Sequence, residues 1–208
     1  MNIQPIVEGD GEVTALPVLL RRLIQASNAY PLGVSQPIRR PRTDLVREDG
    51  VRRAVRVARL KPDCAAILIV FDGDDDCPRD IAPRVQAWAQ AEATPLPCYV
   101  VMPNREYEAW FLATIESLRG TRGIRNDATS HADPESRRGA AEERRRRMAS
   151  NRRYSKPVDQ PALTAVFDMA EAHRRCRSFR RMVRAFGQVA TSLGIALELW
   201  PPEGWETA

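Results

Sequence analysis

The stretch from residue 65 to residue 76 constrains the fold of this chain most. Residues 65–71 (AAILIVF) form a continuous apolar run of strand length, rich in branched side chains. A run without alternation is typical of a strand that is covered on both faces, as in a parallel sheet flanked by helices. Residues 72–76 (DGDDD) follow at once, so four carboxylates are expected where this strand ends.

These carboxylates suggest a metal site, although a solvated loop explains them about equally well. Ligands of open α/β sheets bind at the carboxyl ends of the strands. Crowded carboxylates repel one another unless a cation offsets the repulsion, and clusters of hard oxygen atoms suit Mg²⁺ or Mn²⁺. Aspartate and glycine are also common in turns, so an acidic turn without a ligand stays open as the alternative.

A second acidic turn follows the first predicted strand, residues 3–7. This strand ends in residues 7–12 (VEGDGE), which contain Glu8 and Glu12. Apolar residues at helical spacing then predict a helix with Thr14 as its N-cap. Glu12 is therefore expected in the turn ahead of the helix, where it can point to the same place as Glu8.

The rest of the pattern alternates between strands and helices. The predicted elements after the first strand and helix are a strand at 33–40, a helix at 48–60, the strand at 65–71, a helix at 81–92, a strand at 98–102 and a helix at 107–118. This alternation predicts an α/β fold with a mostly parallel, four-stranded, Rossmann-like sheet flanked by helices. Amphipathic stretches near 163–170 and 179–193 predict a C-terminal helical extension, and alternation at 195–199 predicts a short edge strand.

The two acidic turns come together if the first and third strands are neighbours in the sheet. Glu8 and Asp72 are then close, and Asp74 shares a side with Asp72 if the chain leaves the strand in an extended form. Glu8, Asp72 and Asp74 could hold one Mg²⁺ ion. Glu12 and Asp76 could hold a second ion, directly or through water. Two metal ions would suit phosphodiester hydrolysis, because they clamp the attacking and leaving oxygen atoms.

Candidate residues outside these turns are an acidic pair, an arginine and a lysine. Glu106 and Glu108 follow the strand at 98–102, and Glu106 is the preferred extra ligand or catalytic base, although glutamates near a helix N-terminus are often only dipole partners. Arg105 could bind a phosphate or neutralise the carboxylates. Lys156 stands out because lysine is scarce in this chain, and it could contact the scissile phosphate, although an ordinary surface lysine is the commoner outcome.

The basic residues are almost all arginines. The 208-residue chain has 32 Lys and Arg against 27 Asp and Glu, a formal charge of +5, and only Lys61 and Lys156 are lysines. Arginine suits bidentate contacts with phosphates, although a genome rich in arginine codons gives the same composition. A segment poor in apolar residues carries the arginines that could grip a nucleic-acid backbone or simply keep a loop soluble: Arg144, Arg145, Arg146, Arg147, Arg152 and Arg153.

The sequence shows no sign of a disulfide framework or a membrane segment. The four cysteines are scattered without a CxxC pair, so zinc-finger spacing is also absent. No signal peptide is expected ahead of the first strand, and no apolar run reaches the length that spans a membrane. A cytoplasmic location without membrane contact is therefore expected, and a homo-oligomer is left open.

The order of the two acidic turns resembles the Toprim signature. In that signature an apolar strand ends in Glu-Gly and a later apolar strand ends in Asp-x-Asp, which match residues 8–9 and 72–74. The longer form at 7–12 is most similar to the nucleases of the overcoming-lysogenization-defect type, in which the second glutamate also serves the metal site. With the motifs at 104–111 and 159–160, the chain resembles a small bacterial Toprim-like family whose members often lie beside an ABC-type ATPase of the RecF or SMC kind.

The resemblance implies roles for individual residues. By analogy, Glu8 is a general acid or base, or a metal ligand. Asp72 and Asp74 are implied to bind Mg²⁺, and Asp76 could replace Asp74 because the turn contains several aspartates. A tyrosine nucleophile in a separate DNA-cleavage domain is not evident, so a topoisomerase is not expected.

The resemblance also implies a domain organisation and an activity. A Toprim-like core is expected at 1–118, an arginine-rich insertion or loop at 119–157, and C-terminal helices that pack on the core at 158–208. The implied activity is Mg²⁺-dependent cleavage of DNA or RNA by an effector that works with an ABC-type or RecF-like ATPase in phage defence. The alternative is a non-catalytic docking or nucleotide-binding module of such a complex.

Overall fold

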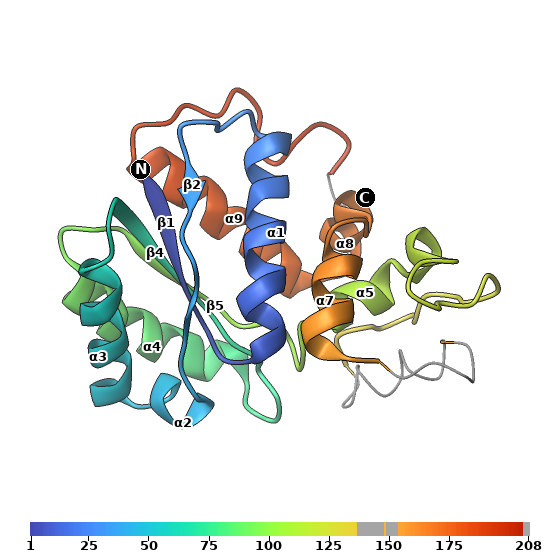
Figure 1. Ribbon diagram of the computed structural model, residues 1–208, viewed down its shortest axis with the longest axis horizontal. Coiled ribbons are helices and arrows are strands. Elements are labelled where there is room, and N and C mark those ends of the chain that lie inside the picture. The colour runs from blue at the N-terminus through green and yellow to red at the C-terminus, as the bar shows by residue number, and fades with distance from the viewer. Residues whose placement is uncertain (137–147, 149–153, 206–208) are drawn as a thin grey trace.

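The computed structural model describes residues 1–136, 148 and 154–205. The predicted nucleic-acid-binding arginines lie outside these described residues: Arg144, Arg145, Arg146, Arg147, Arg152 and Arg153. The described residues form an α/β structure in which helices cover both faces of a parallel sheet (Figure 1). This arrangement confirms the predicted α/β class with a parallel sheet flanked by helices.

The sheet is parallel throughout and has the strand order β2-β1-β4-β5, with β3 also paired to β1. Its strands are β1 (Asn2–Val7), β2 (Gly33–Val34), β3 (Ile38–Arg39), β4 (Cys64–Val70) and β5 (Cys98–Val101). The single strand predicted at 33–40 is thus two short strands, and the sheet has five strands and not four. Pro37 lies between them and has no backbone N–H to donate to β1, which explains the interruption.

Two helical layers bury the two faces of the sheet. One face is covered by α1 (Asp10–Ala26), α7 (Lys156–Thr164) and α9 (Arg177–Ser192), and the other by α3 (Glu48–Arg59) and α4 (Pro78–Ala93) (Figure 1). Successive residues of the central strand β4 therefore enter opposite cores. Leu68 and Val70 pack with the first layer, whereas Ile67, Ile69 and Phe71 pack with the second. The continuous apolar run is explained by this double burial.

The C-terminal helices share one core with the first half of the chain. Trp110 and Phe111 of α5 (Ala109–Ala113) make edge contacts with the rings of Phe179 and Phe167, respectively. The indole N–H of Trp110 also donates to the hydroxyl of Ser178 at 2.8 Å. The predicted helix near 163–170 is divided, because α7 ends at Thr164 and α8 (Met169–Arg175) begins after an N-cap at Asp168.

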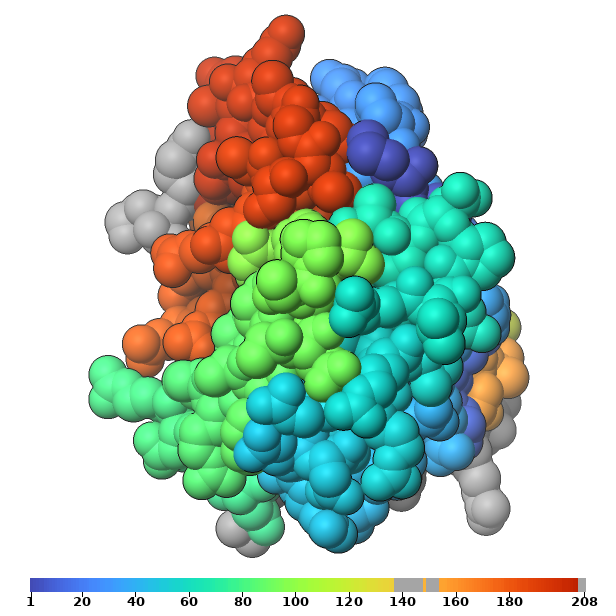
Figure 2. Space-filling model, turned by 90° about the vertical axis from the view of Figure 1, so that its left-hand side faces the viewer, coloured from blue at the N-terminus to red at the C-terminus, as the bar shows by residue number. Residues whose placement is uncertain are grey.

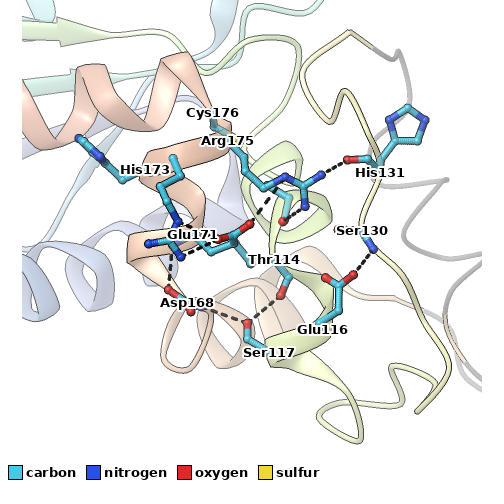
Figure 3. Close-up of polar contacts among 12 residues, drawn as sticks. Thr114, Glu116, Ser117, Ser130, His131, Asp168, Glu171, His173, Arg175 and Cys176 are labelled. Atoms are coloured by element: carbon cyan, nitrogen blue, oxygen red, sulfur yellow. Dashed lines mark hydrogen bonds and ion pairs between the residues drawn. The ribbon is translucent and has the colours of Figure 1, made fainter. Parts of the chain in front are cut away.

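The residues that follow α5 are fastened to α8 by polar contacts (Figure 3). Arg175 of α8 donates to the backbone carbonyl of Ala113 at 2.6 Å and to that of His131. In η1 (Ile115–Leu118), Glu116 accepts the backbone N–H of Ser130 at 2.6 Å. The described beginning of the 119–157 segment is therefore held against the C-terminal helices.

The predicted edge strand at 195–199 does not form in the described residues after α9. This part of the chain instead packs through aromatic rings. Trp200 contacts the ring of Phe186, and its indole would lie 2.5 Å from a Cβ atom placed on Gly187. Gly187 thus lets the chain approach α9 closely, and this contact takes the place of strand pairing.

Candidate functional site

The first and third strands predicted from the sequence correspond to β1 and β4, and these two strands are neighbours in the sheet. β1 and β4 pair in parallel, and Val7 is directly opposite Val70. Glu8 and Asp72 therefore leave the sheet at the same edge, one after each strand. This edge is the carboxyl end of the sheet, where α/β proteins place their ligands.

Asp72 is a largely buried carboxylate at this edge. Its Oδ1 accepts the backbone N–H of Tyr107 at 2.8 Å, and its side chain is 13% exposed. Burial raises the pKa of Asp72 well above its usual value, and the nearby carboxylates of Glu108 and Glu12 raise it further. The ammonium of Lys156 and the Tyr107 N–H act in the opposite direction but do not cancel these effects. Asp72 is therefore held in an environment that disfavours its charged form.

Lys156 lies between two of these carboxylates. Its Nζ is 3.8 Å from Oδ2 of Asp72 and 3.6 Å from Oε2 of Glu108, whose side chain is fully buried. Burial lowers the pKa of Lys156, but Glu108, Asp72 and Glu12 raise it more, so its pKa lies above the usual value. The hydroxyl of Tyr154 also donates to Glu108 at 3.0 Å. Lys156 is thus a component of the acidic edge.

Glu12 does not lie in a turn ahead of the first helix. α1 begins at Asp10 with Gly9 in the N-cap position, so the prediction of Thr14 as N-cap was wrong and Glu12 lies in the first helical turn. A carboxylate there interacts favourably with the helix dipole. Glu12 is buried and accepts a hydrogen bond from the amide of Gln160 at 3.0 Å. This contact connects α1 to α7.

Gly11 permits the close packing of α1 against α7. A Cβ atom at this position would lie 1.9 Å from Oε1 of Gln160 and 3.1 Å from Cβ of Lys156. The absence of a side chain at Gly11 therefore allows α7 to bring Lys156 to the sheet edge. The motif at 159–160 belongs to the same packing, since Asp159 is buried and accepts a hydrogen bond from Arg122 at 2.7 Å.

The acidic loop after β4 turns sharply, contrary to the extended exit that the sequence analysis assumed. Asp74 has a φ of 48°, in the left-handed region, and the N–H of Asp76 donates to the carbonyl of Gly73 at 2.9 Å. Asp74 consequently does not share a side with Asp72. Its side chain faces Arg42, with Oδ2 of Asp74 3.6 Å from the Arg42 guanidinium.

Arg42 is the residue that the sequence analysis missed. It begins the short helix α2 (Arg42–Leu45), and its guanidinium lies 2.6 Å from Oδ2 of Asp76 and 3.7 Å from Oε2 of Glu8. It also donates to the backbone carbonyls of Asp72 and Gly73, to the latter at 3.1 Å. The pairing of β3 with β1 brings this arginine to the edge, and nothing in the local sequence distinguishes it from the neighbouring arginines.

The carboxylates thus form two groups, each around one cation. Asp72, Glu108 and Glu12 influence Lys156, whereas Glu8, Asp74 and Asp76 surround Arg42. Burial raises the pKa of Glu8, Arg42 opposes this effect, and Asp74 and Glu12 add to it.

Two carboxylate oxygens at this edge are buried without a hydrogen bond among the described residues, namely Oε2 of Glu8 and Oε2 of Glu108. Such atoms are uncommon in folded proteins and call for a physical explanation. Each of the two oxygens faces a cationic side chain beyond hydrogen-bond distance, Oε2 of Glu8 at 3.7 Å from Arg42 and Oε2 of Glu108 at 3.6 Å from Lys156.

Arg105 and Glu106 lie in the loop that follows β5. Arg105 donates to the carbonyl of Asp74 at 2.9 Å and lies 3.4 Å from the carboxylate of Asp75, so it ties this loop to the acidic loop. Glu106 contributes to the negative potential at Lys156. Glu108, which the sequence analysis ranked second, is the glutamate in direct contact with Lys156.

The side chains at this edge are chemically suited to bind a divalent cation. Carboxylate oxygens are the donors that Mg²⁺ and Mn²⁺ prefer. Within the described ranges, no group of three or more acidic, histidine or cysteine side chains is already arranged around a common point. The two cationic side chains lie where they neutralise the carboxylates, so the side chains of Glu8 and Glu108 would have to reorient around a metal ion.

The fold and this edge together define a parallel α/β protein with a cationic and acidic site at the carboxyl ends of two adjacent strands. A family described as a domain of unknown function, DUF4276, matches residues 7–186, and the chain belongs to this family. No curated protein and no solved structure shows a significant match to the chain. Among the described residues, no helix combines the length and the apolar character needed to cross a membrane.

Proposed function

We propose that this protein is a Toprim-type nuclease that depends on Mg²⁺ or Mn²⁺ and hydrolyses phosphodiester bonds of DNA or RNA. The observation that carries the proposal is the pairing of Glu8 and Asp72 at the ends of adjacent strands, each with a raised pKa. Strongly perturbed carboxylates at a strand end are typical of functional sites.

Asp72, Glu8 and Glu108 are the residues that would hold the metal ion. When bound, a divalent cation stabilises negative charge on phosphate oxygens and activates water. The raised pKa of Glu8 allows this carboxyl group to hold or release a proton nearer to neutral pH than an ordinary glutamate does. Glu106 has a supporting role in this proposal, because it adds to the negative potential at Lys156.

Two cationic side chains complete the proposed site. The side chain of Lys156 is 40% exposed, so its ammonium can contact a non-bridging phosphate oxygen while it remains beside Asp72. Arg42 maintains the acidic loop in its turned conformation through the Asp72 and Gly73 carbonyls. The resemblance to Toprim proteins further supports an effector role beside an ABC-type or RecF-like ATPase in phage defence.

Metal binding is the first test of this proposal. Calorimetric titration with Mg²⁺ and Mn²⁺ should show binding to the wild type and at least a tenfold weaker affinity for Asp72→Asn. Asp75→Asn is the matched control, because it removes the same charge from the same loop at a side chain that is 66% exposed. Equal affinity in the wild type and both variants would exclude Asp72 from a metal site.

Cleavage is the second measurement of the same proposal. Labelled single-stranded DNA, duplex DNA and RNA should be cut in the presence of Mn²⁺ or Mg²⁺ by the wild type and by Asp75→Asn, and at least a hundredfold more slowly by Asp72→Asn and Lys156→Met. Cleavage that survives in both of these variants would refute the proposal. If Glu8→Gln and Asp72→Asn retain full function in cells without cleavage, the chain is the docking module that the sequence analysis left as the alternative.

A further inference from the structure

Helix α9 presents a row of arginines to solvent. Its sequence, RSFRRMVRAFGQVATS, contains no acidic residue. Arg177, Arg181 and Arg184 are exposed and lie on one face, since they follow the i, i+4, i+7 spacing of a helix. The opposite face is buried through Phe179 and Met182, among others. The arginine face therefore remains outside the core for its whole length.

These arginines differ from the exposed arginines on the other side of the sheet. On α3, Arg52 and Arg53 pair with Glu48 and Asp49, at 2.8 Å and 3.3 Å. Within the described ranges, the guanidinium groups of Arg177, Arg181 and Arg184 have no carboxylate partner. Glu135, which lies near the start of α9, accepts the backbone N–H groups of residues 177 and 178 instead. The positive charge of this face is thus available to an external anion.

The arginine face leads into a groove of about 820 Å³. Arg184 and Gln188 of α9 line this groove together with two aromatic side chains, Tyr99 of β5 and Trp200. Figure 2 shows the described residues after 185, in red, lying beside the residues around β5, in light green. Tyr99 is the second residue of β5, so the groove lies toward the amino ends of the strands, away from the acidic edge.

We propose that this face of α9 and the adjoining groove bind single-stranded nucleic acid. The guanidinium groups of arginine bind phosphates through two hydrogen bonds at once, and aromatic side chains in a basic groove provide surfaces on which bases stack. Arg177 and Arg184 are seven residues apart, which corresponds to about 10 Å along the helix. At an axial rise of about 3.4 Å per nucleotide, the value for one strand of duplex DNA, this length corresponds to about three nucleotides. The aromatic walls favour a nucleic acid over an acidic polypeptide, which has no bases to stack.

The surface is separate from the acidic edge, so the proposal does not rest on catalysis there. Binding is measured with EDTA present, by fluorescence anisotropy of a labelled single-stranded oligonucleotide and the full chain. Under these conditions the wild type and Asp72→Asn should bind equally well. A failure of the nuclease proposal would therefore leave this result unchanged.

The decisive variant replaces the three arginines together: Arg177→Gln, Arg181→Gln and Arg184→Gln. The matched control removes the same charge from the other side of the molecule: Arg47→Gln, Arg53→Gln and Arg79→Gln. The α9 variant should bind at least tenfold more weakly, and the slope of log affinity against log salt should decrease by about 2, since each phosphate contact contributes about 0.7. The control should change affinity less than threefold.

Several results would overturn the proposal. These are no binding by the wild type, equal losses in the two triple variants, or an α9 variant that is folded by circular dichroism and binds normally. Poly-glutamate that competes as effectively as an oligonucleotide of equal charge would identify an acidic polypeptide as the ligand instead. An abasic strand should bind more weakly than a normal strand, and equal affinity would refute base stacking in the groove.

Discussion

At the residue scale, Asp72 makes the stability of the protein depend on pH. Its pKa is raised in the folded state, chiefly by burial and then by Glu108 and Glu12. Above the ordinary aspartate pKa of about 4, the unfolded chain releases this proton while the folded protein retains it. The free energy of unfolding contributed by Asp72 therefore falls as pH rises from about 4 toward the raised pKa, and this loss persists at higher pH.

Replacement of Asp72 by asparagine should stabilise the protein, whereas it should weaken the metal binding that we propose. The amide side chain keeps an oxygen that can accept the Tyr107 N–H but has no charge to bury. We expect the free energy of unfolding at pH 7 to increase by about 1 kcal/mol, a gain typical of single stabilising substitutions, because asparagine removes a charge that burial disfavours. Urea denaturation between pH 4 and pH 8 should show the difference from wild type widening with pH. Asp75→Asn should show no such trend, and a constant difference for Asp72→Asn would contradict the raised pKa.

At the element scale, the free edge of β5 is closed by side chains of α4. The N–H of Cys98 donates to Gln90 at 3.0 Å, and the N–H of Val100 donates to Gln86 at 2.8 Å. The amide of Gln86 also donates to the carbonyl of Cys98 at 2.6 Å. An edge strand without such partners is a template for pairing with another chain. The two glutamines therefore satisfy the edge and block this pairing.

Replacing both glutamines by leucine should destabilise the protein and promote self-association. The Gln86→Leu/Gln90→Leu variant leaves the backbone groups of Cys98 and Val100 without partners, at a cost of about 1–3 kcal/mol for each buried group left unsatisfied. Sedimentation velocity should reveal association that increases with concentration. Gln25→Leu, at an exposed position of α1, is the control and should remain like the wild type. A double variant with unchanged sedimentation would show that the glutamines do not protect the edge.

At the scale of the whole molecule, the beginning and the end of the chain form one core. The same cluster of buried residues contains Leu16 and Leu20 of α1, Trp110, and Phe179 and Phe186 of α9. Removal of the C-terminal helices would expose one face of the sheet, including Leu68 and Val70. The region from 1 to 118 is therefore not expected to be stable without them.

A fragment of residues 1–118 should fail to fold cooperatively. Exposing this core face removes the burial of several large side chains, each worth about 1.5–3 kcal/mol, which together exceed the stability of a typical domain. Thermal denaturation followed by near-ultraviolet circular dichroism should show one transition for the full chain and none for the fragment. A cooperative transition in the fragment would demonstrate that residues 1–118 fold on their own and would contradict this prediction.

Much of the architecture could be predicted from local patterns. The unbroken apolar run of β4 indicated burial on both faces, and the alternation of elements indicated a parallel sheet. Because parallel strands direct their carboxyl ends to one edge, Glu8 and Asp72 were expected at the same edge, but only the pairing of β1 with β4 makes their strands neighbours. Lys156 was singled out by its rarity and is indeed adjacent to Asp72.

The partners of these carboxylates were decided by tertiary structure, because they come from distant parts of the chain. Arg42 reaches the acidic loop across 30 residues, through the pairing of β3 with β1, and Gln160 reaches Glu12 across 148 residues, through the packing of α7 on α1. Periodicity and propensity describe interactions between residues near in sequence, so they predict which segments form strands and helices. They do not contain the long-range contacts that turned Asp74 toward Arg42, buried Glu108 beside Lys156 and left the arginines of α9 facing solvent.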